Sequence, residues 1–383
     1  MQKGANGAER AVMSAPIRVG IDARKLDDYG IGTYLGQLIA HLARPGSPLD
    51  LVAYHPHPDP PPLKTAGHVA WVKQSAPAYS IREQFALHRQ ARRHGLHLLH
   101  IPHYVVPWIA PCPMVVTIHD VIHLLFAENL PGAAARIYAR LMLNRAAATA
   151  RRIITVSQSS KRDLMQHLDV PEGKITVIPL GLPPDCRPGA IEGQPASVTA
   201  GCGIDGPFLL AAGNFRQRHK NLPLLLEAYR LLRQTLPSAP VLVIAGDLPS
   251  QGRHCEPLSR DGVICLGRIS RVQLISLYRA AEAFVSPSSY EGFGLTVLEA
   301  MGCGLPVVAA DCAAVREVAD GAALLAAPGD ARDMAGAMGR VLSDEGLRED
   351  LSRRAIARSR RYSWDEHARR TLAVYQEALG LNP

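Results

Sequence analysis

Two glutamates in one glycine-bearing segment give the clearest chemical signal in the chain. Residues 286–311, SPSSYEGFGLTVLEAMGCGLPVVAAD, have the pattern of a strand end, a loop, a helix and a second apolar strand. Glu291 belongs to the loop and Glu299 to the helix, so we expect the loop carboxylate to face a ligand and the helix carboxylate to reach a more distant pair of hydroxyls. Gly292 and Gly294 allow the backbone to approach a ligand, and the N–H groups that open the helix would point at phosphate oxygens. The alternative is that Glu291 caps the helix and Glu299 lies on the surface.

A second cluster, GNFRQRHKN at residues 213–221, follows an apolar strand and is rich in basic side chains. Basic side chains can bind and neutralise a phosphate-bearing ligand. Lys220 is the candidate for this role, with Arg216 and Arg218 beside it. For each arginine the alternative is a solvated surface charge.

His119 and Asp120 stand at the end of another apolar strand, MVVTIHD. An open α/β sheet binds its ligands at the carboxyl ends of its strands. A histidine there can donate a hydrogen bond to a developing oxyanion or to a sugar hydroxyl, which makes His119 a candidate catalytic residue. Three further histidines are expected to be structural: His100, His103 and His123.

The sequence Gly30-Ile31-Gly32 follows the first predicted strand. It is a weak signal, because it falls short of a full dinucleotide-binding fingerprint and a tight turn accounts for it. It does not indicate a nicotinamide site.

These residues need a scaffold, and an alternation of apolar strands with helical segments supplies one. The N-terminal half begins with a predicted strand at 17–23, a helix at 30–43 and a strand at 49–55, and continues with strands in HLLHIP, MVVTIHD and RIITVSQ. The second half repeats the alternation from FLLAAG to LPVVAA. The predicted fold class is α/β, with two tandem Rossmann-like domains that face each other across a cleft.

The composition fits this architecture. The chain has 383 residues, 47% of them hydrophobic, so it is long enough for two cores. Its formal net charge of +8 suits a phosphate-bearing substrate, an anionic membrane or a nucleic acid. The seven cysteines are odd in number and scattered, with no Cys-x-x-Cys pair and no histidine at metal-ligand spacing, which predicts reduced thiols in a cytoplasmic protein.

Two basic segments are not explained by the candidate site: HRQARRH at 88–94 and RRAIARSRR at 353–361. A solvated helix face accounts for most such runs. Because Ile81, Phe85 and Leu87 interleave with the first segment, it can also lie against anionic lipid, which would place the protein peripherally at the inner face of the membrane. No nucleic-acid reader motif accompanies the charge, so nucleic acid is not an expected partner.

Glu291, seven intervening residues and Glu299, set within SYEGFGLTVLEAMGCGLPVV, resemble the signature of the retaining GT-B glycosyltransferases of glycosyltransferase family four. The resemblance extends from VGIDARKLDDYGIGTY near the front to YSWDEHARRTLAVYQEAL at the back. It implies two Rossmann-like domains of the GT-B type, a nucleoside diphosphate sugar donor held mainly by the C-terminal domain, and no metal or other cofactor.

This resemblance and the pattern of the sequence together predict how the chain divides into domains. We expect a flexible leader at 1–15, an acceptor-side domain at 16–185, a linker at 186–206, a nucleotide-sugar-binding domain at 207–361 and a helix at 362–383 that returns to the N-terminal domain.

The resemblance also implies roles for residues. It places Glu291 on the hydroxyls of the donor sugar, Glu299 on the ribose, and His119 on the donor sugar near the reacting carbon. It surrounds the sugar and the diphosphate with backbone groups of four consecutive residues: Gly292, Phe293, Gly294 and Leu295.

The basic loop both matches and departs from the family. Lys220 matches the family's diphosphate-binding lysine, but Asn214 stands where most members have an arginine, and one extra residue separates Gly213 from Lys220. Arg216 or Arg218 would then supply the second charge. The family's first loop lies over the diphosphate and beside the acceptor, and its candidates here are Gly30, Gly32, Thr33 and Tyr34.

The expected activity is retaining transfer of a hexose to a hydroxyl of a glycan or of a lipid-linked sugar. IDARKLDDYGIGTY and TIHDVIHL resemble mannosyltransferases of polysaccharide assembly, which makes GDP-mannose the first expected donor and a UDP-hexose the alternative. The altered loop at Asn214 leaves open a nucleotide-binding protein of the same fold without turnover. An epimerase or a phosphorylase would share the architecture.

Overall fold

The computed structural model describes residues 16–57, 63, 67–74, 76, 81–188, 201–249 and 262–381. The predicted leader, residues 189–200 of the predicted linker, and Cys255 lie outside these residues. The described cysteines are all free thiols. No described helix combines the length and the apolar character needed to cross a membrane.

The N-terminal domain is built on a parallel sheet. Within the described residues its strand order is β3-β2-β1-β4-β5-β6-β7. The strands are short and mostly apolar because helices cover both faces of a parallel sheet. Their bounds are β1 Ile17–Asp22, β2 Leu49–His55, β3 Val69–Lys73, β4 Leu98–Ile101, β5 Met114–Thr117, β6 Arg152–Thr155 and β7 Ile175–Val177.

The helices of this domain lie between the strands in the chain, as right-handed parallel crossovers require. Their bounds are α1 Tyr29–Leu42, α2 Ile81–Arg93, α3 Ile122–Leu125, α4 Ala133–Thr149 and α5 Gln158–Leu168, with short 3-10 turns η1 Ala127–Asn129 and η2 Glu172–Lys174. Leu87 of α2, Leu143 of α4 and Leu164 of α5 belong to one buried cluster with the strands, which covers one face of the sheet.

The C-terminal domain repeats the design. Its described strands have the order β10-β9-β8-β11-β12-β13, and all pairs are parallel. The strands are β8 Phe208–Ala212, β9 Val241–Ala245, β10 Val263–Gly267, β11 Ala283–Ser286, β12 Val307–Ala310 and β13 Leu324–Ala326. The helices are α7 Leu222–Thr235, α9 Arg271–Ala280, α10 Leu295–Gly302, α11 Ala313–Ala319, α12 Ala331–Ser343 and α13 Glu345–Ser359, and the 3-10 turns are η3 Pro184–Cys186, before β8, and η4 Arg218–Lys220.

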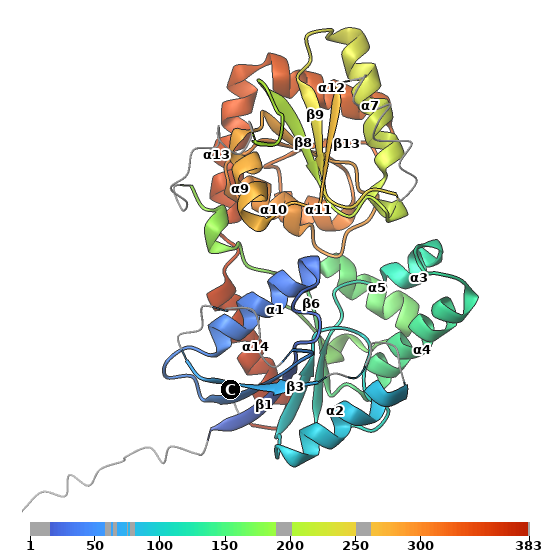
Figure 1. The fold of residues 1–383 in the computed structure, drawn as a ribbon, viewed down its shortest axis with the longest axis vertical. Coiled ribbons are helices and arrows are strands. Elements are labelled where there is room, and N and C mark those ends of the chain that lie inside the picture. The colour runs from blue at the N-terminus through green and yellow to red at the C-terminus, as the bar shows by residue number, and fades with distance from the viewer. Residues whose placement is uncertain are drawn as a thin grey trace, which may run out of the picture.

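Figure 1 shows the two domains stacked along the long axis, with the N-terminal domain below. The last helix, α14 (Trp364–Ala378), lies in the lower domain and packs against α1. The hydroxyl of Tyr375 on α14 lies 2.6 Å from Nδ1 of His100 on β4, and Arg370 donates to the carbonyl of Val177 on β7. The chain therefore crosses between the domains twice.

The strand order places the candidate site. In each sheet the order reverses once, between β1 and β4 in the first and between β8 and β11 in the second. A crevice opens at the carboxyl ends of the strands at such a reversal, because the flanking loops lead away in opposite directions. The loops that follow β1, β4, β8 and β11 are therefore expected to meet there. The predicted fold class is confirmed.

Candidate active site

A pocket of about 290 Å³ lies between the two domains. The N-terminal domain supplies residues from the loop after β1, the start of α1, the loop after β4 and the end of β5 onward. The C-terminal domain supplies η4 with the residue before it, and the loop before α10. Of the residues predicted from sequence, the pocket brings together His119, Lys220, Glu291 and Gly292. A larger, more open hollow of about 680 Å³ lies beside α13, at the opposite end of the C-terminal sheet, and contains none of the predicted residues.

Lys220 and Glu291 form an ion pair in this pocket. Nζ of Lys220 lies 2.6 Å from Oε1 of Glu291, and the two side chains are only 17% and 13% exposed. Burial alone would raise the pKa of Glu291, but the charge and hydrogen bond of Lys220 outweigh it and hold that pKa below its usual value. Glu291 does not cap α10, whose N-cap residue is Gly294 with no side-chain hydrogen bond. The capping alternative is therefore wrong.

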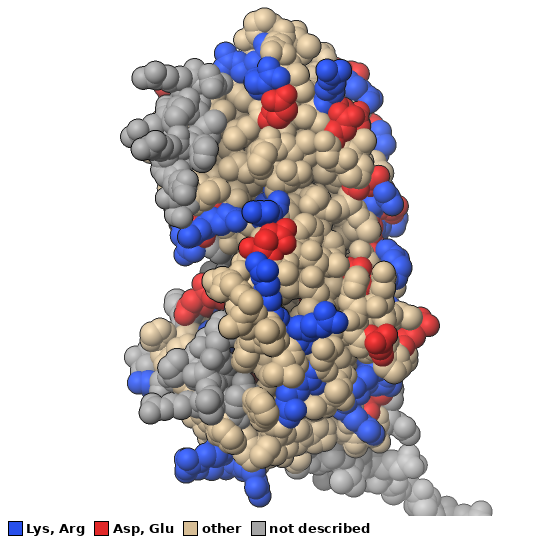
Figure 2. Space-filling view, turned by 90° about the vertical axis from the view of Figure 1, so that its right-hand side faces the viewer, with Lys and Arg blue, Asp and Glu red and all other residues tan. Residues whose placement is uncertain are grey.

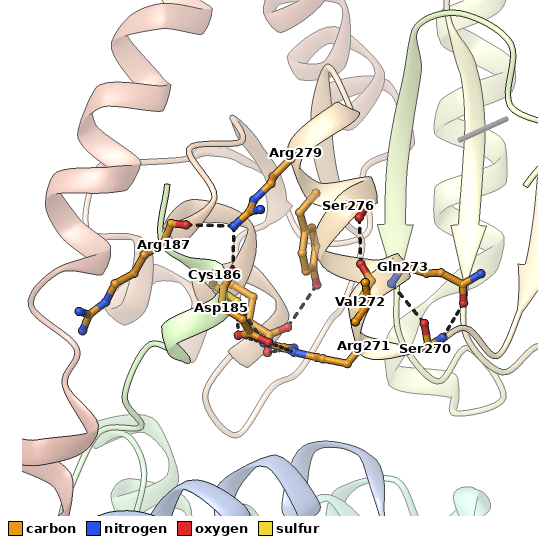
Figure 3. Close-up of polar contacts among 11 residues, drawn as sticks. Asp185, Cys186, Arg187, Ser270, Arg271, Val272, Gln273, Ser276 and Arg279 are labelled. Carbon is orange, nitrogen blue, oxygen red and sulfur yellow. Dashed lines mark hydrogen bonds and ion pairs between the residues drawn. The ribbon is translucent and has the colours of Figure 1, made fainter. Parts of the chain in front are cut away.

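Glu299 lies on α10 and is buried rather than on the surface, with 3% of its side chain exposed. Arg271, the first residue of α9, donates to it at 2.5 Å and also forms two hydrogen bonds of 2.9 Å with the carboxylate of Asp185. Figure 3 shows Arg271 reaching Asp185 in the segment that leaves the N-terminal domain. Burial raises the pKa of Glu299 even though the charge of Arg271 opposes the shift. The surface alternative for Glu299 is wrong, and Arg271 is a residue that the sequence did not single out.

His119 lines the pocket and carries a buried nitrogen without a partner. Its ring is hydrogen bonded to the carbonyl of Pro102, while Nε2 has no partner, so Nδ1 is the donor in that bond. Burial lowers the pKa of His119 to about 4, so the ring is neutral and Nε2 is an acceptor. The ring of Tyr34 packs edge-on at 4.7 Å and fixes its orientation. In this state His119 is poised to accept a hydrogen bond from a hydroxyl rather than to donate one.

Asp120 introduces a titratable charge between the domains. Burial raises its pKa to about 6, and the nearby charge of Glu291 adds to the shift. The backbone N–H of Ile122 donates to Oδ1 of Asp120, which fixes the carboxyl group in place. His119 and His219, which line the same pocket, both have pKa values lowered to about 4 by burial. Asp120 is therefore expected to change its charge near pH 6, a range in which both histidines stay neutral.

We predict that the affinity for an anionic ligand rises by about fivefold as the pH falls from about 8 to about 5, because protonation of Asp120 removes a negative charge from the pocket. The stability that protonated Asp120 contributes is full below its unfolded pKa and is lost as the pH rises through about 6. Calorimetric titration at several pH values with a nucleoside diphosphate sugar, whose diphosphate keeps the same charge over this range, measures the effect. Asp120→Asn should remove most of the pH dependence, and an unchanged profile in that variant would contradict the assignment.

His103, predicted to be structural, also lines the pocket. Its Nε2 lies 3.0 Å from the carboxylate of Asp22, the last residue of β1, and its Nδ1 accepts from the N–H of Val105. Arg24 binds the same carboxylate with two hydrogen bonds of 2.8 and 2.6 Å. Asp22 ends β1 and His103 follows the neighbouring strand β4, and this position at the carboxyl ends of two strands was a signal that would have found both residues.

The glycines of the first motif lie in the first turn of α1 rather than in a loop. Gly30 and Gly32 are both helical, and the expected tight turn is wrong. A Cβ on Gly32 would stand 2.3 Å from the carbonyl oxygen of Leu26, so this glycine is needed for packing. Ile31 lines the pocket, whereas Tyr34 is buried with its hydroxyl 3.0 Å from that of Thr117. Thr33 is not among the pocket residues.

The segment before α10 touches the other domain through its backbone. The carbonyl of Gly292 accepts hydrogen bonds from the hydroxyls of Ser157 and Ser160 at 2.7 and 3.0 Å. A Cβ on Gly292 would stand 2.7 Å from the carbonyl oxygen of His119, so only glycine fits this approach. Gly294 has φ of +97°, Phe293 packs its ring against Tyr362, and Leu295 begins α10.

The structure does not bring Arg216 or Arg218 to the pocket. Both are exposed, and their backbone N–H groups bond to Asn214 and to Asn129 respectively. Lys25, which follows β1, lines the pocket instead. The sequence did not single out this cation, although its place after a strand end was a usable signal.

The described residues contain no group of three or more histidine, cysteine, aspartate or glutamate side chains that could hold a metal ion. Two Rossmann-like domains with a pocket between them are the arrangement of a GT-B fold, and comparison with known proteins agrees. Residues 29–185 match the family described as Glycosyltransferase Family 4, and residues 203–358 match Glycosyl transferases group 1. The chain belongs to the group 1 / family 4 glycosyltransferases, whose N-terminal and C-terminal parts these two family models describe.

Several characterised proteins are similar to the chain. The O-antigen chain mannosyltransferase B of Escherichia coli is 31% identical over 68% of this chain and 70% of its own length. The D-inositol 3-phosphate glycosyltransferase of Xylanimonas cellulosilytica is 30% identical over 71% of this chain and 68% of its own.

The solved structures support the fold. Sucrose-phosphate synthase from Thermosynechococcus elongatus has a TM-score of 0.75 at 22% identity, covering 96% of this chain and 100% of that one. HepE from Anabaena, in complex with UDP and glucose, has a TM-score of 0.72 at 17% identity, covering 94% of this chain and 100% of its own.

Proposed function

We propose that the protein transfers a hexose, with retention of the anomeric configuration and without a metal ion, from a nucleoside diphosphate sugar to a hydroxyl of a glycan or lipid-linked sugar. The observation that carries the proposal is the pairing of Lys220 and Glu291, from the C-terminal domain, with His119 of the N-terminal domain in one pocket. GDP-mannose is the proposed donor, supported by the E. coli mannosyltransferase among the relatives. A UDP-hexose is the alternative, supported by HepE, which is described with UDP-glucose.

In the proposed reaction the acceptor oxygen forms a bond to the anomeric carbon while the bond from that carbon to the diphosphate oxygen breaks. The leaving phosphate oxygen takes the proton of the acceptor hydroxyl on the same face of the sugar. Lys220 stabilises the charge that develops on the diphosphate. Glu291, kept ionised by Lys220, accepts hydrogen bonds from sugar hydroxyls, and Nε2 of His119 accepts another.

Binding to nucleotides is the first test. A ligand that binds the folded protein raises its stability by about 2.7 kcal/mol at a hundredfold excess over Kd, which shifts the thermal midpoint by several degrees. We expect GDP and GDP-mannose to give such a shift, and UDP to give a smaller one. If UDP and UDP-glucose give the larger shift, the donor assignment is wrong while the proposed reaction stands.

Product analysis tests the reaction itself. Incubation with GDP-mannose and a mannose-terminated acceptor in excess chelator should give an α-linked product. An isomerised sugar would indicate an epimerase, and a sugar 1-phosphate would indicate a phosphorylase. Nucleotide binding that Glu291→Gln leaves unchanged, with no transfer to any acceptor, would instead support a binding protein without turnover.

A further inference from the structure

Helix α4 of the N-terminal domain has a second apolar stripe that the protein core does not use. Its inner face is complete, with Met142 and Ala146 fully buried. On its outer face Ile137 is 70% exposed and Leu141, one turn later, is 50% exposed. Large aliphatic side chains in this register on an outer face are not needed for folding, so they indicate a contact surface.

A proline-bounded loop extends this stripe. Trp108 and Ile109, between Pro107 and Pro111, are 50% and 56% exposed. The carbonyl of Trp108 accepts a hydrogen bond from Arg145 of α4, and the guanidinium of Arg145 lies 5.4 Å from the centre of the indole. The loop is therefore fixed against α4, one turn beyond Leu141.

Helix α2 lies on the other side of the same loop. Nδ1 of His88 lies 2.9 Å from the carbonyl oxygen of Ile109, and Phe85, one turn earlier on α2, is 52% exposed. Five exposed apolar side chains thus lie on adjoining elements, and we call them the α2–α4 surface: Phe85, Trp108, Ile109, Ile137 and Leu141.

The charges among these side chains are nearly all positive. Helix α4 carries three arginines and no acid, and its exposed Arg136 and Arg140 alternate with Ile137 and Leu141. The uncharged loop between β4 and β5 adds no acid, and the described side chains of α2 add Arg89, Arg92 and Arg93. Figure 2, which faces the side where α2 and α4 lie in Figure 1, shows Lys and Arg side chains spread over a mostly uncharged surface in its lower half.

We propose that the α2–α4 surface docks the protein on an anionic lipid bilayer. Aromatic and aliphatic side chains enter the interface, and arginines bind the negative headgroups while their stems cover apolar surface. The apolar residues are separated by arginines, whereas the core of a protein interface is depleted of charge, so a bilayer fits this surface better than a protein partner.

The docked orientation has a consequence for the acceptor, which rests on the proposed function. Helix α3 packs against α4, and Ile122 and His123 of α3 line the pocket between the domains. Leu125, at the end of α3, is 38% exposed. A lipid-linked sugar could therefore present its sugar to the pocket while its lipid stays in the bilayer beside α4.

The test measures binding of the full chain to large vesicles of phosphatidylcholine with or without phosphatidylglycerol, by co-sedimentation at several salt concentrations. We expect binding to the anionic vesicles only, weakening as salt increases. Trp108 supplies an internal probe, because Trp364 is buried and Trp71 is partly buried. Brominated lipid should quench the protein's fluorescence, and Trp108→Phe should remove most of the quenching.

Matched variants identify the surface. Arg136→Glu with Arg140→Glu should weaken vesicle binding by at least about 30-fold, since each basic residue near the surface contributes about fivefold. Ile137→Asp with Leu141→Asp should abolish vesicle binding. Both side chains are exposed enough that the substitutions should leave folding intact. The control, Arg353→Glu with Arg354→Glu on α13, makes the same charge change at exposed positions in the other basic segment and should bind like the parent.

Several results would overturn the proposal. The first is binding to neutral vesicles that is as strong as binding to anionic vesicles. The second is no binding to neutral or anionic vesicles, and the third is full binding by both α4 double variants. A dimer in sedimentation velocity that Ile137→Asp dissociates in the absence of lipid would show that a second copy covers the surface instead. Because the thermal shift with nucleotides does not involve α4, it separates failure of docking from failure of the proposed function.

Discussion

Lys220→Ala is expected to reduce sugar transfer by about a thousandfold, the scale seen when a preorganised group is removed from a developing negative charge. Lys220 lines the pocket and pairs there with Glu291, whereas Arg216 and Arg218 of the same loop are exposed and do not line it. The loss should be mainly in kcat, because the leaving diphosphate carries more negative charge in the transition state than in the bound donor. Steady-state kinetics with the donor varied at saturating acceptor measures the split between kcat and KM.

The variant also leaves Glu291 buried without its cation, so its folding must be checked by thermal denaturation. Lys220→Arg keeps the charge and should retain more activity than Lys220→Ala. Lys161→Ala provides a matched control, since it removes a 2.9 Å lysine–glutamate pair whose glutamate, Glu172, is largely exposed. A Lys220→Ala protein that is folded and retains a tenth or more of the parent activity would show that this lysine does not stabilise the leaving group.

The fold was largely predictable because its signals are local. Each apolar run between helical segments became a strand, and the two halves repeat the alternation. The short strands β7 and β13, of three residues each, and β3 were not predicted. Such strands bury few side chains of their own and are fixed by their neighbours in the sheet, which periodicity along the chain does not reveal.

The candidate site was predictable where a motif and a strand end coincide, as they do at His119, Lys220 and Glu291. The role of a side chain was not predictable where a partner distant in sequence holds that side chain in place. His103 is held by Asp22, 81 residues away, and the chain carries 15 histidines that look alike without that contact. The burial of Glu299 likewise depends on α9, which no local pattern connects to α10.

The net charge of +8 is also explained in part. One share, Lys220 and Lys25, lies in the pocket, where a diphosphate is proposed to bind. Much of the 353–361 segment is paired within the C-terminal domain: Arg353 and Arg354 bond to Asp350, and Arg358 bonds to Asp320. The arginines of α4, by contrast, lie beside exposed apolar side chains with no acid on their helix.

Arg271→Ala is expected to lower the free energy of unfolding by about 3 kcal/mol, because it leaves the buried carboxylate of Glu299 without its cation. Asp185, in the segment that leaves the N-terminal domain, loses both of its hydrogen bonds to Arg271 at the same time. Urea denaturation followed by circular dichroism measures the change. Arg230→Ala, which breaks a two-bond pair with Glu227 on the exposed side of α7, is the control and should leave the unfolding midpoint unchanged.

A double variant separates the loss of the ion pair from the loss of packing. Arg271→Met with Glu299→Gln removes both charges and keeps the side-chain volume, so it should recover most of the stability lost in Arg271→Ala. We expect Arg271→Ala and the double variant both to bind a nucleoside diphosphate with a Kd about tenfold above that of the parent, because the family resemblance places Glu299 on the ribose and both variants alter its charge or position. If the double variant had both the stability and the nucleotide affinity of the parent, Glu299 would only hold α9 against α10. If its stability stayed as low as that of Arg271→Ala, Arg271 would stabilise the domain through Asp185 alone.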